Sequence, residues 1–100
     1  MRTPLAALAI ALAAATAYAQ APDPNLGRNV AASCANCHGT DGVSQGTVPS
    51  LAGQSSQDIV TKMKEFKAGT RPATIMQQLA KGYTDDQIER AAAYFAAQKR

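Results

Sequence analysis

The spacing of apolar positions in residues 20–100 is helical in several short stretches, and no stretch alternates as a strand would. The pattern predicts helices at residues 24–35, 56–67 and 73–81, and one more that follows Thr84. The segment 39–53 is rich in Gly, Ser and Thr and is predicted to be an irregular loop. No linker, repeat or low-complexity segment interrupts this order. We therefore expect one all-α domain.

Several of these predicted helices have recognisable end signals. Asp23 is a candidate N-cap for the first helix, and Pro24 suits its first turn, where a missing N–H costs nothing. Gly69 and Gly82 follow the second and third helices as stop signals. The stretch 84–87, Thr-Asp-Asp-Gln, has the form of a capping box, so the last helix is predicted to begin there. Its apolar face consists of Ile88, Ala91, Ala92 and Phe95.

The first nineteen residues have the layout of a secretory signal peptide. Arg2 gives a positive start, residues 5–15 form a continuous apolar run, and residues 17–19, Ala-Tyr-Ala, are a small-x-small cleavage site. Cleavage after Ala19 is predicted, with cleavage after Ala21 as the alternative. A membrane anchor is the other interpretation, but the apolar run is short of the roughly 20 residues that a spanning helix needs.

The pattern predicts an exported protein, with a signal peptide at residues 1–19 and one domain at residues 20–100. No membrane span is expected after cleavage. A domain of that length has little apolar core, so a buried prosthetic group would help by forming its centre. The full sequence has ten basic and seven acidic residues, and removal of Arg2 leaves nine basic ones. The excess of basic residues is small and forms no basic stripe, and the chain has no Trp. Nucleic-acid binding needs both a basic surface and aromatic stacking groups. We expect no nucleic-acid partner.

Residues 34–38, Cys-Ala-Asn-Cys-His, are the motif that decides the chemistry. Cys34 and Cys37 are the only cysteines of the chain, and His38 is its only histidine. The spacing Cys-x-x-Cys-His is typical of covalent haem attachment, in which two thiols add to the porphyrin vinyl groups and the histidine binds the iron. A single histidine excludes bis-histidine ligation and any catalysis that needs two imidazoles.

Three other interpretations of the motif are weaker. A zinc site needs four ligands, and the consecutive Cys37 and His38 do not supply the spaced pairs that such sites use. A thioredoxin-like redox pair expects a strand and a βαβ setting, which the pattern lacks. A plain disulfide between Cys34 and Cys37 would close a small, strained loop.

The iron of such a haem has a second axial position, and a methionine is its natural soft, neutral ligand in this chain. Met63 and Met76 are the candidates. Met63 shares a regular helical seam with Ile59 and Phe66, which is the setting of a core residue. Met76 follows Pro72 in a short segment that can fold across the haem face, so Met76 is favoured.

Several further stretches have the order and spacing found in class I cytochromes c. They are residues 34–39, Cys-Ala-Asn-Cys-His-Gly; 41–42, Asp-Gly; 49–54, Pro-Ser-Leu-Ala-Gly-Gln; 66–71, Phe-Lys-Ala-Gly-Thr-Arg; and 94–95, Tyr-Phe. The chain therefore resembles class I cytochromes c, especially the small periplasmic monohaem cytochromes. Residues 74–83, Thr-Ile-Met-Gln-Gln-Leu-Ala-Lys-Gly-Tyr, resemble the haem subunit of flavocytochrome c sulfide dehydrogenase. The resemblance implies an all-α class I cytochrome c fold, with about four short helices around one haem.

This resemblance implies a function and four residues that carry it. Cys34 and Cys37 would hold one haem c through thioether bonds, and His38 and Met76 would be its axial ligands. Such a protein is a periplasmic one-electron carrier without a catalytic site of its own. A His/Met pair keeps both axial positions filled, and the neutral sulfur raises the reduction potential relative to two imidazoles.

Supporting roles are also implied by the resemblance. The carbonyl of Pro49 would accept the free ring N–H of the ligand histidine, and Arg71 would approach a haem propionate. Gly27 and Tyr94 would form the close contact at which the first and last helices cross. Val30 departs from the family, in which many relatives have an aromatic residue at that position.

A redox protein is the expected partner. The resemblance favours a flavoprotein sulfide dehydrogenase subunit, and because this chain has no Gly-x-Gly-x-x-Gly fingerprint, the flavin would lie on another polypeptide. A freestanding carrier that serves a respiratory chain or oxidase is the alternative. An open iron site for peroxide or a small gas, with Met76 unbound, is the third. Lys62, Lys64 and Lys67 are candidates for a docking face, although a charge run on a helix is usually its solvated side.

Overall fold

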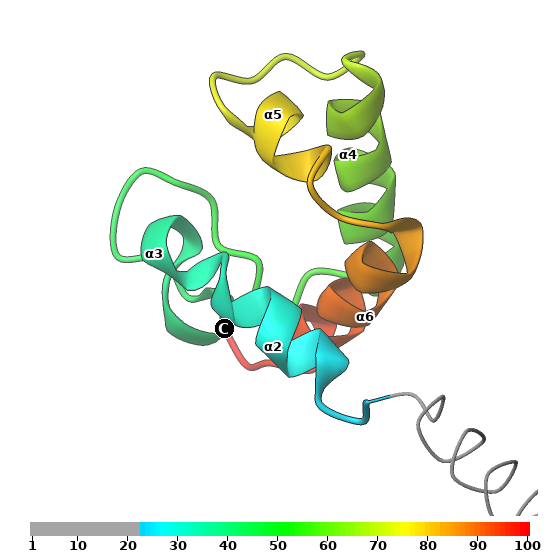
Figure 1. Ribbon diagram of the computed structural model, residues 1–100. Helices are drawn as coiled ribbons and strands as arrows, with labels where there is room; N and C mark the ends of the chain where they lie inside the picture. Colours follow the sequence, from blue (N-terminus) through cyan, green and yellow to red (C-terminus); the bar gives the residue numbers. More distant parts are fainter. Residues whose placement is uncertain (1–22) are drawn as a thin grey trace, which may run out of the picture.

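The computed structural model describes residues 23–100, and within that range every regular element is helical (Figure 1). The elements are α2 (Leu26–Ala32), α3 (Ala35–His38), the 3₁₀ turn η1 (Thr40–Gly42), α4 (Ser56–Ala68), α5 (Met76–Ala80) and α6 (Asp85–Ala96). The predicted all-α fold is confirmed. The predicted signal peptide and its cleavage sites after Ala19 or Ala21 lie outside the described residues. Within residues 23–100, no helix has the length and apolar character needed to cross a bilayer.

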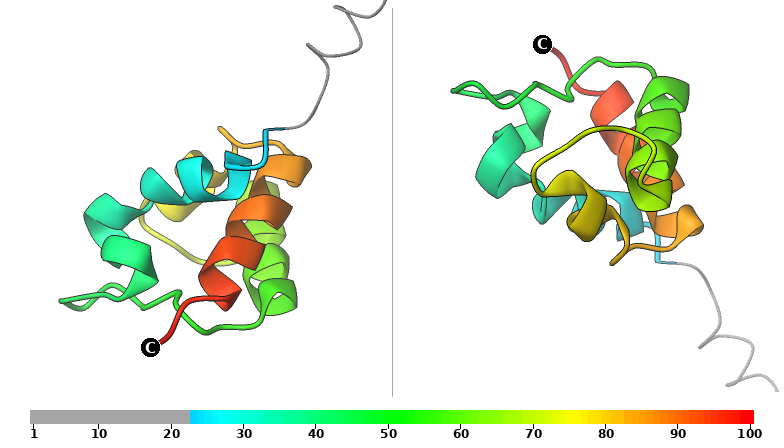
Figure 2. Two further views of the ribbon diagram at one scale, coloured as in Figure 1. Left: turned by 90° about the horizontal axis from the view of Figure 1, so that it is seen from below. Right: turned by 90° about the horizontal axis from the view of Figure 1, so that it is seen from above.

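The crossing of α2 and α6 organises the domain, and α4 packs on α6 from another side (Figures 1 and 2). Gly27 permits this crossing, because a Cβ at that position would lie 2.6 Å from the carbonyl oxygen of Arg90. The atoms nearest to a Cβ at Gly27 belong to Arg90, which lies one helical turn before the expected partner Tyr94. Val30 and Tyr94 both pack against the buried core beside this contact.

The core is small, and three of its five buried residues are alanines. Its buried residues are Ala31, Ile59, Ala91, Ala92 and Phe95. Within residues 23–100, no large side chain is fully buried. A domain of this size gains limited stability from such a core, so a large apolar cofactor would contribute much of the buried surface.

The first predicted helix, residues 24–35, is shorter in the structure. It begins at Leu26, because Asp23 Oδ1 accepts the N–H of Asn25 at 2.8 Å and forms a turn before the helix. It ends at Ala32, where the N–H groups of Ser33 and Cys34 bond to carbonyls three residues back, at 3.1 and 3.0 Å. These tighter bonds end the α-helix, so the haem motif forms a separate turn, α3.

The third predicted helix, residues 73–81, is also shorter. It begins at Met76, because Ile75 has a non-helical φ of −125° and residues 72–75 follow an irregular path. The other two predictions are close to the structure. Helix α4 ends at Ala68 and is capped by Gly69, whose φ of 78° is left-handed. Thr84 caps the start of α6 and forms the predicted capping box. The predicted loop 39–53 contains one short helical turn, η1.

Candidate haem-binding site

The motif at residues 34–38 forms one compact helical turn. The N–H groups of Cys37 and His38 both bond to the carbonyl of Cys34, at 3.3 and 2.9 Å. This turn places the two cysteines three residues apart on a helix, so their side chains share one side. Cys34 is half-buried, Cys37 is exposed, and both are free thiols. Burial raises the pKa of the Cys34 thiol, and the hydrogen bond from Ser33 partly opposes this shift.

His38 is held by the chain that follows it. Its Nδ1 lies 2.7 Å from the carbonyl oxygen of Pro49, which leaves Nε2 free to bind a metal. Gly39 comes directly after it with a φ of 88°, and a Cβ there would lie 1.8 Å from the carbonyl oxygen of Val43. No other residue fits this position without a shift of the backbone.

Backbone hydrogen bonds of Gly42 bring Pro49 beside His38. The Gly42 carbonyl accepts the N–H groups of Leu51 and Ala52, at 2.8 and 3.1 Å, so the loop after Pro49 returns to the turn after His38. Asp41, within that turn, accepts a hydrogen bond from the hydroxyl of Tyr94 on α6. The His38 segment is therefore tied both to its own loop and to the last helix.

The two methionines have different surroundings. Met63 is partly buried and packs against the core cluster, as its place on a helical seam indicates. Met76 is also partly buried, but it begins the short helix α5 and lies outside that cluster. Helix α5 packs on α4, whereas α3 packs on η1. Figures 1 and 2 show α3 and α5 facing each other across the molecule with no helix between them.

Arg71 is folded against α4. Its Nε lies 3.2 Å from Glu65 Oε2, and its guanidinium carbon lies 5.9 Å from the ring centre of Phe66. The Nε atom is nevertheless buried without an aligned hydrogen-bond acceptor among the described residues. The Glu65 carboxylate is near enough for an ion pair but poorly directed, so one donor of Arg71 has no partner of its own.

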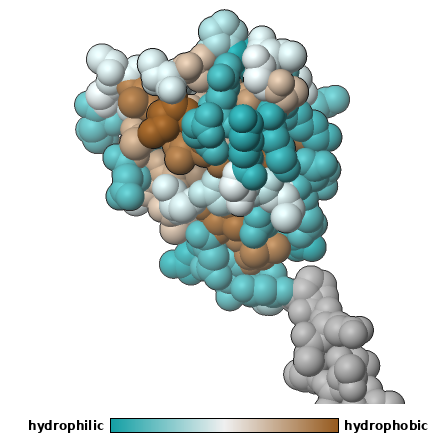
Figure 3. All heavy atoms as spheres, turned by 45° about the horizontal axis from the view of Figure 1, so that its top comes forward, coloured by the Kyte–Doolittle hydropathy of each residue, from teal (hydrophilic) through white to brown (hydrophobic). Residues whose placement is uncertain are grey.

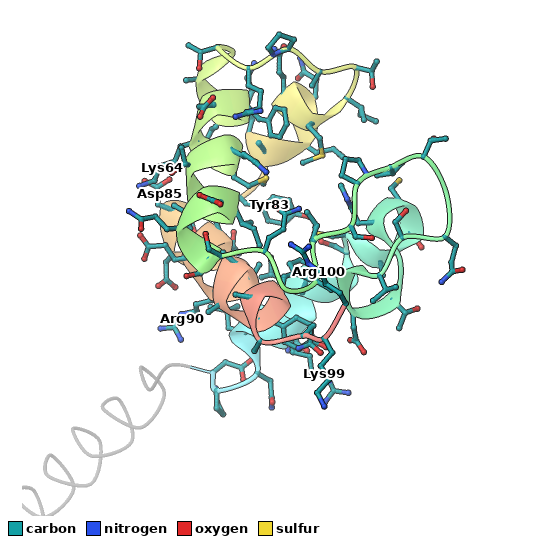
Figure 4. The ribbon with its side chains drawn as sticks, turned by 180° about the vertical axis from the view of Figure 1, so that it is seen from behind. Lys64, Tyr83, Asp85, Arg90, Lys99 and Arg100 are labelled. Carbon is teal, nitrogen blue, oxygen red and sulfur yellow. The ribbon has the colours of Figure 1, made fainter. Side chains whose placement is uncertain are left out.

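The three lysines considered as a docking face differ in their surroundings. Lys67 Nζ donates to the carbonyl of Tyr83 at 2.6 Å, and Lys62 Nζ donates to Gln54 Oε1 at 3.1 Å. Of the three, Lys64 alone is exposed, at the outer edge of α4, and the other two are partly buried (Figure 4). Lys62 and Gln54 instead line a hollow of about 530 Å³ that reaches Arg100 and contains none of the six predicted site residues.

The family model for cytochrome c matches residues 24–99. This chain belongs to the cytochrome c family. The cytochrome subunit of sulfide dehydrogenase from Chlorobaculum tepidum is 46% identical to it over 69 residues, which are 69% of this chain and 63% of the relative. Cytochrome c4 from Pseudomonas aeruginosa is 39% identical over 80 residues, which are 79% of this chain and 40% of the relative.

A solved structure supports the same fold. Reduced recombinant cytochrome c4 from Pseudomonas stutzeri has a TM-score of 0.71 at 32% identity, over 79% of this chain and 47% of that one. The chain thus spans less than two thirds of these related proteins. Membership of the family is compatible with a covalently bound haem c, and the class I cytochrome c fold is confirmed.

The residues of the site fit a haem c. They offer two free thiols, one free imidazole nitrogen, a thioether and an arginine donor without a partner. Ile75 and Leu79, which flank Met76, are 56% and 45% exposed. Figure 3 shows that apolar side chains gather on the face that comes forward in that view, between hydrophilic regions. An apolar ring with two carboxylates suits this combination of groups.

Ser33 and Tyr83 lie beside the site and were not predicted from the sequence. Ser33 Oγ lies 2.6 Å from the hydroxyl oxygen of Tyr83. These residues are fifty positions apart, and although Tyr83 ends the stretch 74–83, no role was predicted for the side chain of either residue. No local pattern reports such a contact.

Proposed function

We propose that this cytochrome is a periplasmic one-electron carrier with a single haem c, attached through Cys34 and Cys37 and ligated by His38 and Met76. The observation that carries this proposal is the 2.7 Å contact between His38 Nδ1 and the Pro49 carbonyl. That contact occupies Nδ1, so Nε2 is the ring nitrogen that can bind the iron, and it makes the imidazole a better electron donor to a metal. The bound haem supplies an iron that alternates between the ferric and ferrous states.

Each of the other residues has a simple task in this proposal. The Met76 sulfur would hold the iron together with His38, so that electron transfer would need little rearrangement and small molecules would be excluded. The Arg71 guanidinium would stabilise a propionate, and the support for this role is the family resemblance together with an Nε atom that lacks a hydrogen-bond acceptor among the described residues. We further propose that the chain is synthesised with a signal peptide at residues 1–19 and functions as a domain of residues 20–100 after its removal.

A flavoprotein sulfide dehydrogenase subunit is the proposed electron donor. The support is the similarity to the cytochrome subunit of sulfide dehydrogenase, together with the sequence of residues 74–83. A freestanding carrier is the second candidate, supported by the similarity to cytochrome c4. Gel filtration of the cytochrome mixed with a flavoprotein sulfide dehydrogenase subunit separates the two. Co-elution supports a permanent subunit, and separate elution supports a diffusible carrier.

Visible spectra of the exported, haem-loaded protein test the axial ligands. The ferric protein is expected to show the weak red absorption of a bond between methionine sulfur and iron. Met76→Ala should abolish this band, whereas the control Met63→Leu should retain it, because Met63 packs in the core. A wild-type protein that lacks the band and binds carbon monoxide readily would have an open iron site, and the carrier proposal would fail.

A further inference from the structure

The hydroxyl of Tyr83 joins two halves of the molecule. Its oxygen lies 2.6 Å from Ser33 Oγ. Ser33 directly precedes Cys34, and the distance from Ser33 Oγ to Cys34 Sγ is 3.9 Å. Within the part of the chain that the structure describes, this is the only hydrogen bond that joins residues 23–42 directly to residues 56–83. The first of these segments contains the haem motif, and the second contains Met76.

Tyr83 is itself firmly held on the Met76 side. Its carbonyl accepts Lys67 Nζ from α4 at 2.6 Å, and the same Nζ lies 3.5 Å from Asp85 Oδ1 at the start of α6. Its N–H bonds at 3.3 Å to the carbonyl of Ala80, the fully buried last residue of α5. In Figure 4, Tyr83 lies toward the middle of the molecule, whereas Asp85 lies at its edge. A rigidly placed side chain therefore reaches across to Ser33.

The Met76 segment has few other attachments. Helix α5 packs mainly on α4, and its neighbours Ile75 and Leu79 are largely exposed. Gln77 Nε2 donates to the Arg71 carbonyl at 2.8 Å near the start of α5, which is a contact within the same half of the molecule. Tyr83 thus provides the direct polar link between the sixth-ligand segment and the segment that carries Cys34.

We propose that Tyr83 is a positioning residue that holds the Met76 segment against the haem motif and thereby keeps the iron closed to outside ligands. This inference rests on the proposed function, because it takes Met76 as the sixth ligand. When the hydroxyl is removed, the Met76 segment separates more easily from the segment that carries Cys34. An added ligand then competes better with Met76 for the iron. Loss of one net hydrogen bond, about 1 kcal/mol, corresponds to roughly a fivefold change in that competition.

Imidazole binding to the ferric, haem-loaded protein tests the inference. Tyr83→Phe keeps the ring and removes only the hydroxyl, and it should bind imidazole about fivefold more tightly than wild type. Ser33→Ala removes the other partner and should have a similar effect. The double variant should bind no more tightly than either single one, because both changes break the same contact.

Tyr94→Phe is the matched control. It also removes one hydrogen-bonded tyrosine hydroxyl, but that bond joins α6 to Asp41 and not to the Met76 side. Its imidazole affinity should equal that of wild type. If Tyr83→Phe and Ser33→Ala also bind like wild type, or if Tyr94→Phe tightens binding as much as they do, the inference is wrong.

The red absorption of the wild-type protein separates failure of the inference from failure of the proposed function. If that band is absent in wild type, Met76 is not the ligand and the proposed function fails first. If the band is present and Tyr83 variants bind imidazole normally, only the positioning role fails. Should Tyr83→Phe not fold, Ser33→Ala on the surface decides the same question.

Discussion

The two segments that carry the proposed axial ligands are built in different ways. The His38 segment is fixed by close backbone contacts, with Gly39 against Val43 and the Gly42 carbonyl bonded to two N–H groups. The Met76 segment is a five-residue helix that begins without a side-chain cap. Separate hydrogen bonds hold this helix, through Gln77 near its start and through Tyr83 in the turn that follows its end.

This difference indicates which ligand can be released. A segment held by steric contact cannot move without overlap, so the histidine bond has a rigid support. A segment held by separate hydrogen bonds, each worth about 1 kcal/mol, can open at modest cost. We expect the sixth ligand to respond to small substitutions, and the fifth ligand to change only when the fold is damaged.

The largest effect is expected where the His38 segment is disrupted. Gly39 combines φ 88° and ψ 160°, and a Cβ there would overlap the Val43 carbonyl. Gly39→Ala should therefore lower the free energy of unfolding by roughly 3 kcal/mol or more and reduce the yield of haem-loaded protein. Urea denaturation and the haem content of purified protein measure both effects.

Gly69→Ala is the control for this prediction. Gly69 also has a positive φ, of 78°, but a Cβ there would meet nothing within 4 Å. Its replacement should cost about 1 kcal/mol from backbone strain alone. Equal losses for the two alanine variants would contradict the rigid support assigned to His38.

A second disruption acts through the helix crossing that precedes the haem motif. Gly27→Ala would place a Cβ 2.6 Å from the Arg90 carbonyl and push α2 away from α6. The free energy of unfolding should fall by about 2 to 3 kcal/mol. Gly46→Ala, at a position open to solvent, should change it by less than about 0.5 kcal/mol. Thermal melts that rank the two variants equally would argue against this crossing.

A smaller effect is expected on the Met76 side. Gln77→Ala removes the hydrogen bond to the Arg71 carbonyl and should lower the free energy of unfolding by about 1 kcal/mol. Its exposed neighbour offers the comparison, since Gln78→Ala should change the value by less than about 0.5 kcal/mol. If the two variants are equally stable in urea, the contact of Gln77 does not hold α5.

The last prediction concerns pH. The hydrogen bond to Asp41, followed by desolvation, raises the pKa of Tyr94. Because the folded state keeps the proton longer than the unfolded state, this stabilisation is present below the ordinary tyrosine pKa of about 10 and disappears as pH rises through the folded value. The stability difference between wild type and Tyr94→Phe should be constant near neutral pH and decline in alkaline solution. Urea denaturation at several pH values checks this, and a difference that never declines would refute it.

Local sequence signals predicted those elements whose ends depend on neighbouring residues. The capping box of α6 is formed by Thr84 and Gln87, whose two reciprocal bonds measure 2.9 and 3.1 Å. The end of α4 at Gly69 needs only a residue that accepts a left-handed φ. The predicted end of the first helix was wrong because Ser33 and Cys34 bond to carbonyls three residues back. The predicted start of the third helix was wrong because Ile75 has a non-helical φ. The apolar spacing reports neither feature.

The sequence alone determined that this chain is helical and that residues 34–38 are suited to covalent haem attachment, because both properties lie in residues a few positions apart. Only the tertiary structure placed Pro49 on His38, Lys67 on Tyr83, and Tyr83 on Ser33. These contacts join residues 11, 16 and 50 positions apart. They depend on how the loop folds back onto the turn after His38 and how the helices pack on one another, which no local pattern of apolar and polar residues specifies.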